Sequence, residues 1–283
     1  MQHKAGDYFN VQIQNNSTLD DSQVYVTAFG SAFDPTQPTH LAVDQSFISL
    51  TAEGYGTLVT PTSSTSSLTY SYPLNGLTKT GGVYNLYLPP SGGRVYLSIG
   101  APLCLSIQTT GNVAINDPNF ILPQDPNYQV IYDKIEYFWN PLTSTDSDSP
   151  PIPATAVIDT TAVDFFGLPL TVSLNGQTKG IKKSLSDVQN ILLNGNSSSN
   201  PTQPGLTDSS FTGSWEMLPV YGSNGTAVRV VSPNKAPSFR GSYLHDYITD
   251  VWIHYGKPGN TLTIAVQTSE VSGNFTGSNR SVI

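Results

Sequence analysis

The sequence predicts a mainly β protein, with an antiparallel sandwich or barrel followed by a smaller mixed α/β lobe. Charged residues make up only 11% of the 283 residues, while Gly, Pro, Ser, Thr and Asn are abundant, which favours many short strands joined by turns. Alternating apolar runs continue to about residue 175, and helical spacing appears only beyond that point. We therefore expect a β lobe over 1–175 and a mixed α/β lobe over 176–283.

The first lobe contains a series of short runs that are typical of antiparallel strands. In chain order they are 9–14, 23–29, 46–50, 84–88, 94–100, 103–108, 131–140 and 156–174. Turn pairs such as Asn75-Gly76 and Gly81-Gly82 separate some of them. No repeat of fixed period is present, which argues against propellers and solenoids.

The second lobe begins with a helix signal, because Ser184 is a suitable N-cap for a helix with one apolar face. A second helix is expected over about 242–254, and a strand over 261–268. Six residues of the second helix have the spacing of a buried stripe: Leu244, Tyr247, Ile248, Val251, Trp252 and Tyr255.

Composition excludes several classes of function. A formal charge of −8 and a pI near 4.7 argue against nucleic acid, which requires clustered Lys and Arg. No run of 18 apolar residues exists, so no membrane span is expected, and Cys104 alone cannot form an intrachain disulfide. The histidines lack metal-ligand spacing and no nucleotide-binding motif occurs, so we expect a monomer without metal or cofactor.

Two carboxylates lie among aromatic and β-branched residues in the runs 131–140 and 156–174. A charge in such a place is costly unless it is hydrogen-bonded or used, so Glu136 and Asp164 require an explanation. Strand alternation puts Asp159 and Asp164 on opposite faces of one run, unless a bulge intervenes between them. Only one of these two aspartates is then expected to share a cleft with Glu136.

The face of the strand that carries Glu136 also carries Lys134, Phe138 and Asn140. A structural interpretation competes with a catalytic one here, because carboxylates within strands commonly pair with nearby cations. Lys134 lies two residues before Glu136 on the same face. A close ammonium favours the ionised carboxylate, which is the wrong direction for a general acid at neutral pH.

The segments DPNYQVIYDKIEYFWN and TAVDFFGLPLTVSL carry a family resemblance. With VYVTAFG, SGGRVYLSIGAPL and AVRVVSPNKAPSF leading into YLHDYITDVW, they resemble glycoside hydrolase family 64 in the same order. This is a family of inverting endo-β-1,3-glucanases with a barrel architecture shared with thaumatin-like proteins. The resemblance implies a thaumatin-like β lobe, a cleft between that lobe and the mixed α/β lobe, and hydrolysis of internal β-1,3-glucosidic bonds in laminarin-like glucan.

The resemblance also implies site residues. The family's catalytic Glu lies in an E-F/Y-x-x-N strand and its catalytic Asp in a V-D-F-x-x-L-P strand, which match EYFWN and VDFFGLP here. Glu136 thus resembles the general acid and Asp164 the general base of an inverting hydrolase, which needs two carboxyl groups. We expect Asn140, Phe138 and Lys134 to contact the substrate, although Phe138 replaces a smaller polar residue of the family.

Family members continue well beyond the strand that matches TLTIAVQT, so we expect the second lobe to be incomplete in this chain. The start MQHKAGDYFN lacks the apolar core of a signal peptide. Because the implied substrate is a polymer, we expect a secreted protein whose presequence is absent from this chain. A cytoplasmic location stays open. Two other functions stay open: a non-catalytic β-glucan-binding protein on the same scaffold, and a β-sandwich interaction protein unrelated to sugars.

Overall fold

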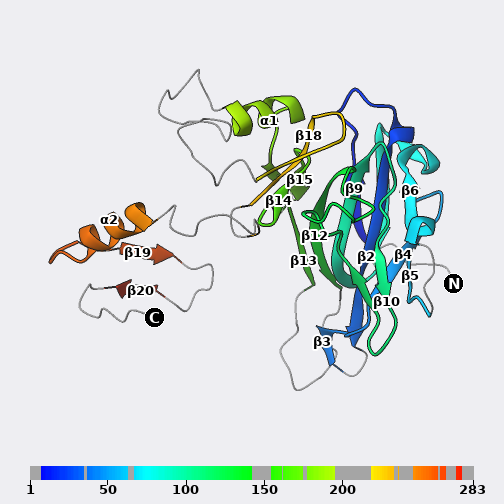
Figure 1. The fold of residues 1–283 in the computed structure, drawn as a ribbon. Coiled ribbons are helices and arrows are strands. Elements are labelled where there is room, and N and C mark those ends of the chain that lie inside the picture. The colour runs from blue at the N-terminus through cyan, green and yellow to red at the C-terminus, as the bar shows by residue number, and fades with distance from the viewer. Residues whose placement is uncertain are drawn as a thin grey trace. The chain divides into compact units, whose positions relative to one another are not determined.

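The chain divides into two compact units, Met1–Ala236 and Pro237–Ile283, and the predicted mainly β fold is confirmed (Figure 1). A computed structural model describes residues 8–34, 37–62, 67–141, 154–160, 162–174, 177–194, 218–232, 235, 245–260, 262–265 and 272–275. The lobe boundary expected near residue 176 stays a prediction.

The largest sheet of the first unit has eight strands, and all the strand pairs described in it are antiparallel. The main order is β13 (Thr155–Thr160), β12 (Ile131–Asn140), β9 (Ser91–Ile99), β2 (Val24–Asp34), β4 (Ser46–Leu50) and β5 (Gly56–Val59). Two further strands, β3 (Gln37–Leu41) and β6 (Ser71–Pro73), pair with β2. The expected run 131–140 is confirmed at both ends.

A second, three-stranded sheet makes the unit a sandwich. Its order is β1 (Phe9–Ile13), β8 (Val83–Leu88) and β7 (Lys79–Thr80). Alternate residues of these strands, such as Val11 and Leu86, pack with Val95 and Ile135 of the large sheet in one apolar core. The antiparallel sandwich predicted from alternation is therefore confirmed.

The other face of the large sheet carries a second core at one end. Phe29, Tyr96 and Tyr132 pack there against Leu103 and Ile115, which belong to the segment after β9. Because side chains alternate along a strand, β12 directs one set of residues into the first core and the next set onto this second face. The same face carries the charged side chains Lys134 and Glu136 of β12 and Arg94 of β9.

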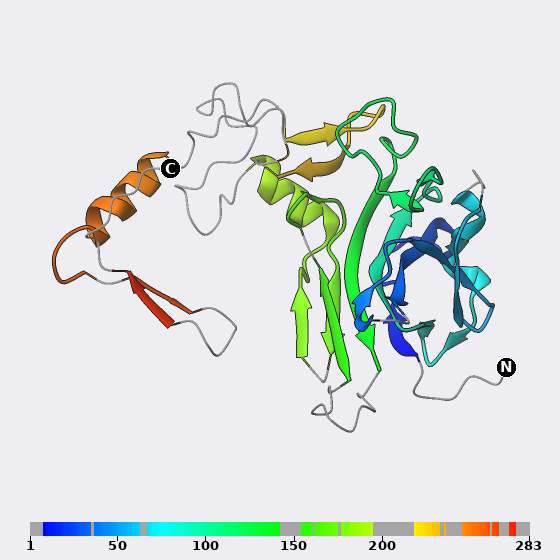
Figure 2. The same ribbon diagram turned by 90° about the horizontal axis from the view of Figure 1, so that it is seen from below.

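The remaining elements of the first unit are short. They are β10 (Ser106–Gln108) with β11 (Ala114–Asn116), β14 (Phe165–Phe166) with β18 (Ala227–Val231) and β17 (Pro219–Tyr221), β15 (Thr171–Leu174) with β16 (Gln177–Gly180), the helix α1 (Leu185–Asn194), and the 3-10 turns Asp21–Gln23, Ser67–Tyr70 and Leu74–Gly76. β15 lies beside β13 (Figure 2). The Asp187 N–H donates to Ser184 Oγ at 3.1 Å, so the predicted N-cap is confirmed.

The single strand expected over 156–174 is wrong. The chain forms β13, leaves the large sheet, forms β14 against β18, and then forms β15. The run expected over 103–108 is likewise a strand only in β10. In both places alternation identifies extended residues but carries no information about which strand they pair with.

The second unit contains α2 (His245–Tyr255), β19 (Leu262–Ala265) and β20 (Ser272–Phe275), with the two strands antiparallel. The expected helix and strand are present, but Ile248 and Trp252 are 46% and 73% exposed, so the predicted burial of the stripe is wrong for these two residues. Helical spacing shows which residues share a face of the helix, whereas burial of that face needs a partner surface. Neither described helix is long and apolar enough to cross a membrane.

The turn after β14 is held tightly against β12. A Cβ atom at Gly167 would lie 1.9 Å from Tyr132 O, which excludes any other residue without movement of the backbone. The buried Asp133 carboxylate accepts the N–H groups of Gly167 and Leu168 at 2.9 and 3.0 Å. Burial raises the pKa of Asp133 to about 6, although these backbone hydrogen bonds oppose the rise. The turn fixes Asp164 beside β12.

We predict that Gly167→Ala lowers the free energy of unfolding by about 2–4 kcal/mol, because the added methyl group meets backbone that cannot yield without breaking the Asp133 hydrogen bonds. Urea denaturation followed by circular dichroism measures the change. Gly76→Ala is the matched control, since its Cβ would have no neighbour nearer than 3.7 Å. Equal stability of the two variants would contradict the close approach.

Candidate active site

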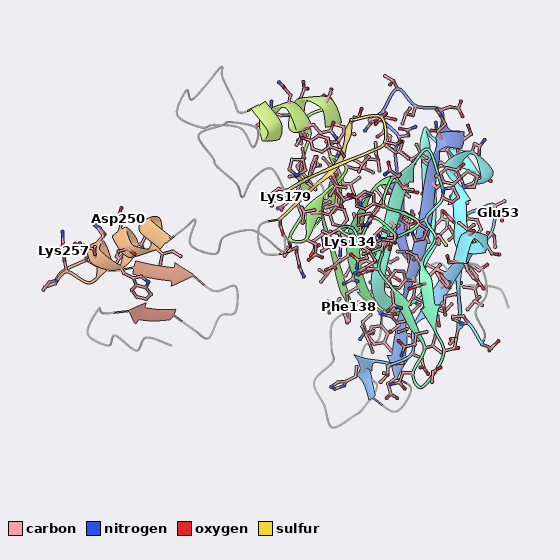
Figure 3. All side chains as sticks on the ribbon, viewed as in Figure 1. Glu53, Lys134, Phe138, Lys179, Asp250 and Lys257 are labelled. Atoms are coloured by element: carbon pink, nitrogen blue, oxygen red, sulfur yellow. The ribbon has the colours of Figure 1, made fainter. Side chains whose placement is uncertain are left out.

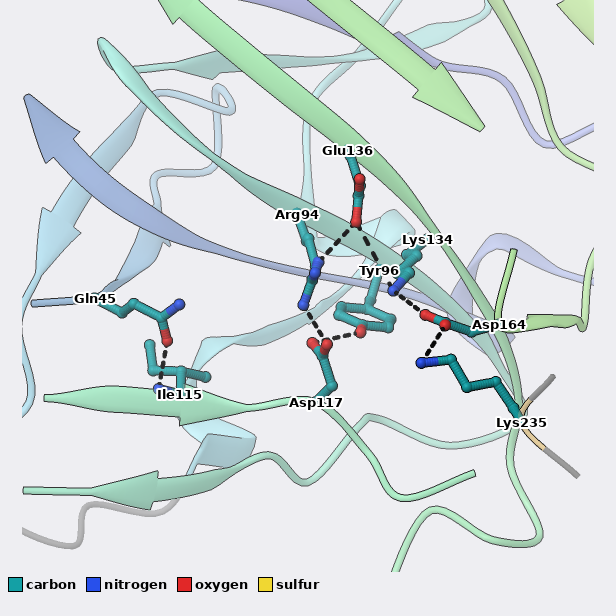
Figure 4. Close-up of polar contacts among 9 residues, drawn as sticks. All are labelled: Gln45, Arg94, Tyr96, Ile115, Asp117, Lys134, Glu136, Asp164 and Lys235. Carbon is teal, nitrogen blue, oxygen red and sulfur yellow. Dashed lines mark hydrogen bonds and ion pairs between the residues drawn. The ribbon is translucent and has the colours of Figure 1, made fainter. Parts of the chain in front are cut away.

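A buried ammonium group brings the two predicted carboxylates into one site. Lys134 lies on β12 and is only 4% exposed (Figure 3). Its Nζ lies 3.2 Å from Asp164 Oδ2 and 3.9 Å from Glu136 Oε1 (Figure 4). These two contacts limit the separation of the two carboxylate oxygens to about 7 Å, close to the spacing of paired catalytic carboxyl groups.

A second lysine meets the other oxygen of Asp164. Lys235 Nζ lies 3.2 Å from Asp164 Oδ1. The backbone holds this arrangement, because the Ser232 N–H donates to Asp164 O at 2.9 Å and the Lys235 N–H donates to Ser232 O at 3.0 Å. Burial, the largest single influence, would raise the pKa of Asp164, but hydrogen bonds from Lys235 and Lys134 outweigh it and leave that pKa below its ordinary value.

Glu136 is held from the neighbouring strand. Arg94 on β9 is paired with Glu136 in the ladder, and its Nε donates to Glu136 Oε1 at 3.0 Å. Arg94 Nη1 also donates to Asp117, whose other oxygen accepts the Tyr96 hydroxyl at 2.7 Å. A chain of four polar side chains therefore runs from the second core to Glu136 (Figure 4).

Asp159 lies directly opposite Glu136 in the ladder between β13 and β12. Strand alternation through 156–174 predicted that Asp159 and Asp164 face opposite ways, and this is wrong because the strand ends at Thr160 before Asp164. All three carboxylates thus lie on one side of the sheet. Burial and the nearby negative charge of Glu136 raise the pKa of Asp159.

The other two expected substrate residues extend the same strand face. Phe138 packs edge-on against Phe33, with ring centroids 5.4 Å apart, and is partly exposed. Asn140 is buried at the end of β12. The structure places both of them on the strand that carries Glu136, while their contact with a substrate stays a prediction.

Sequence reasoning missed Arg94, Asp117 and Lys235. Arg94 follows Gly92-Gly93 within an otherwise ordinary strand pattern, and only the ladder register puts it beside Glu136. Asp117 and Lys235 lie in irregular segments that come near the site through long-range pairing. None of the three had a local signal that distinguishes a site residue from a surface charge.

The chemistry available to this cluster is proton transfer. It combines two carboxylates near one buried cation, one of them kept ionised by two ammonium groups and the other hydrogen-bonded to a guanidinium. When two carboxyl groups lie in different environments, one can act as a general acid and the other as a general base.

Comparisons with known proteins show which family the chain matches and which folds it resembles. The glycoside hydrolase family 64 model, described as beta-1,3-glucanase, matches residues 7–282. Among solved structures, a laminaripentaose-producing beta-1,3-glucanase in complex with laminaritetraose is 23% identical, with a TM-score of 0.60 over 91% of this chain and 62% of that chain. A beta-1,3-glucanase domain from Clostridium beijerinckii is 18% identical, with a TM-score of 0.55 over 94% of this chain and 66% of that one.

These two structural likenesses concern the fold, and the chain spans less than two thirds of the length of either protein. A search of curated proteins finds no match.

We predict that Lys134→Met raises the pKa of Asp164, because one of the two hydrogen-bonded ammonium groups is lost. The depressed pKa gives wild-type protein stability that is present above the ordinary value of 3.8 and is lost as the pH falls through the folded value. Carbon-13 NMR titration of Asp side chains measures the pKa, with Asp164→Asn to assign the signal. Lys79→Met, which removes the ammonium partner of Asp21, is the control. An unmoved Asp164 titration would contradict the assignment.

Proposed function

Because the chain belongs to glycoside hydrolase family 64, the beta-1,3-glucanase family, we propose that it hydrolyses internal β-1,3-glucosidic bonds of a laminarin-like glucan with inversion at the anomeric carbon. One observation carries this proposal: the buried Lys134 ammonium lies between two partly exposed carboxylates, Glu136 and Asp164. Such a pair is what inverting hydrolysis of a glycoside requires.

The electrostatics support separate roles for the two carboxylates. Asp164 accepts hydrogen bonds from two ammonium groups that hold its pKa below the ordinary value, so it is ionised at neutral pH. An ionised carboxylate can take a proton but has none to donate, and Asp164 is therefore the general base. Glu136 is the general acid, and the Arg94 guanidinium stabilises the carboxylate that remains after proton donation.

The proposed reaction proceeds in one displacement. Glu136 donates its proton to the glycosidic oxygen as the bond from that oxygen to the anomeric carbon breaks. A water molecule on the opposite face of the sugar ring forms the new bond to this carbon and transfers a proton to Asp164. The products leave with Glu136 ionised and Asp164 protonated, and exchange of one proton with solvent restores both groups.

The spacing of the carboxylates is compatible with this route. Their contacts with Lys134 allow a separation of up to about 7 Å, which includes the lower end of the roughly 6.5–9.5 Å range of inverting enzymes. The range near 5–5.5 Å that is typical of retaining enzymes also lies below this limit. The stereochemistry of the product therefore decides between the two mechanisms.

The same strand face offers contacts for the sugar. Phe138 presents a partly exposed ring next to Glu136, and an aromatic ring suits the apolar face of a glucosyl unit. Asn140 is buried at the end of this strand face, so contact of its amide with sugar hydroxyl groups requires a local movement of its side chain. Lys134 lies between the two carboxylates, so within this proposal its ammonium group is near the scissile bond. The structural neighbour in complex with laminaritetraose supports a glucan ligand.

Within this proposal the enzyme is a monomer and acts outside the cell, where a polymeric glucan substrate is accessible.

We predict that Glu136→Gln and Asp164→Asn each reduce laminarin hydrolysis by about 10²- to 10⁴-fold, the range lost with a general acid or base. Reducing-sugar release measures the effect. Glu136→Gln should leave the thermal midpoint nearly unchanged, whereas Asp164→Asn should lower it, because the buried Lys134 loses its nearer partner.

Asp159→Asn is the matched control, since it removes a third carboxylate from the same sheet face. It should remain active. If Asp159→Asn were inactive and Asp164→Asn active, the general base would be Asp159, and our assignment of Asp164 would be wrong.

We predict that the first product released from laminarin is the α anomer, because a single displacement inverts the β configuration. Proton NMR of the anomeric region during the first minutes of reaction, before mutarotation, makes the measurement. Initial release of the β anomer would contradict inversion.

Calorimetry of the Glu136→Gln variant with laminari-oligosaccharides of increasing length separates the enzyme from a glucan-binding protein. On our proposal the variant binds more tightly as the oligosaccharide lengthens, while wild-type protein cleaves the same ligands. Binding without any cleavage by wild-type protein would indicate a non-catalytic glucan-binding protein, and no binding would remove both functions.

A further inference from the structure

One oxygen of Glu136 receives the cationic contacts of the site. Arg94 Nε donates to Oε1 at 3.0 Å, and the nearest approach of Lys134 Nζ, 3.9 Å, is to the same atom. Figure 4 shows both dashed lines ending on this oxygen, with the second oxygen pointing away from both cations. A carboxyl oxygen that accepts hydrogen bonds from cations is the less favourable place for a proton, which leaves Oε2 as the oxygen that can carry it.

Arg94 has an anchor of its own. Its Nη1 donates to Asp117 Oδ2, and Asp117 Oδ1 accepts the hydroxyl of Tyr96 at 2.7 Å. Tyr96 is 1% exposed within the second core, so its position is set by packing. The guanidinium is thus fixed at one end by a buried residue and presents Nε to Glu136 at the other.

Asp117 also changes what the arginine does electrostatically. A guanidinium with no other partner would favour the ionised form of an adjacent carboxylate, which is unsuitable for a group that must donate a proton. Pairing with Asp117 shares the positive charge of Arg94 between two carboxylates.

We propose that Asp117 and Arg94 are positioning residues for the general acid: Arg94 holds Oε1 of Glu136 so that Oε2 carries the catalytic proton, and Asp117 offsets the arginine charge that would otherwise remove it. The inference rests on the proposed function, since it assigns the acid role to Glu136. It goes beyond that function by giving roles to two residues that need not touch the glucan.

Other charged groups face Glu136 and act together with Arg94. Lys134 lies two residues before it on β12, and Asp159 lies opposite it on β13. Beyond Lys134 lies Asp164 with its second partner, Lys235. The test therefore compares single changes to Arg94 and Asp117 with all of these groups left in place.

Carbon-13 NMR titration of Glu side chains tests the proposal on the full chain without relying on activity. The chain has only four glutamates, Glu53, Glu136, Glu216 and Glu270, so the Glu136 signal can be assigned with Glu136→Gln. Asp117→Asn should move the midpoint of the Glu136 titration down by about one pH unit, because the positive charge of Arg94 is then no longer offset by Asp117. Arg94→Gln should move it up by a similar amount.

Asp21→Asn is the matched control. Asp21 has the same kinds of partner as Asp117, because it accepts the Tyr84 hydroxyl at 2.5 Å and the Lys79 ammonium at 3.0 Å, but Tyr84 belongs to the three-stranded sheet. This variant should leave the Glu136 titration and the hydrolysis of laminarin unchanged. It controls for the general effect of losing an acid that is bonded to a tyrosine and a cation.

The pH dependence of kcat/KM is the second readout. Its alkaline limb should move to lower pH in Asp117→Asn and to higher pH in Arg94→Gln, because this limb reports loss of the proton from the general acid. A purely structural role would change the rate without moving the limb in opposite directions.

Shifts of opposite sign in the two variants, with no shift in Asp21→Asn, would support the proposal. An unmoved Glu136 titration in Asp117→Asn, or a shift equal to that in Asp21→Asn, would overturn it. If Asp117→Asn does not fold, the Glu136 titration in Arg94→Gln becomes the test. An upward shift of its midpoint would support the proposal, and no shift would overturn it. If the titrations shift as expected but Glu136→Gln still hydrolyses laminarin, the positioning stands and the proposed function fails.

Discussion

The ammonium group of Lys134 is the charge around which the rest of the site is arranged. A cation that is 4% exposed costs several kcal/mol in desolvation unless partners compensate for it. Asp164 supplies the nearer partner, at 3.2 Å, although it lies on a segment that has already left the large sheet. The close fit of Gly167 to Tyr132 and the hydrogen bonds to Asp133 hold that segment in place. A buried lysine thus requires a fixed turn, and the fixed turn presents a carboxylate.

The two faces of β12 explain why this site can exist on a sandwich. Ile135 and Tyr137 enter the first core, and their burial contributes packing energy that holds the strand in the sandwich. The alternate residues Lys134 and Glu136 emerge on the second face, where the second core ends. Side chains on paired strands are held more rigidly than side chains on loops, which suits groups that must transfer protons over hydrogen-bond distances. The alternation that directs Ile135 and Tyr137 into the core therefore also places Lys134 and Glu136 together on the opposite face.

Sequence patterns predicted the elements of this site better than their contacts. The strand 131–140 and the shared face of Lys134 and Glu136 followed from alternation, and Asp164 was singled out by its apolar surroundings and a family motif. The break after Thr160 was missed because β14 pairs with β18, more than 60 residues away in the chain. Arg94 was missed for a related reason, since only the register of β9 puts it opposite Glu136. Pairing depends on the whole fold, while a pattern is local.

The central claim is that Glu136 and Asp164 work on opposite sides of one glycosidic bond. A crystal structure of the Glu136→Gln variant with a bound laminari-oligosaccharide tests it most directly. We expect a glycosidic oxygen within hydrogen-bond distance, about 2.6–3.2 Å, of the side chain at position 136, and a water molecule between Asp164 and the anomeric carbon. An oligosaccharide bound away from these two residues, or a water held by Asp159 while Asp164 contacts only its lysines, would contradict it.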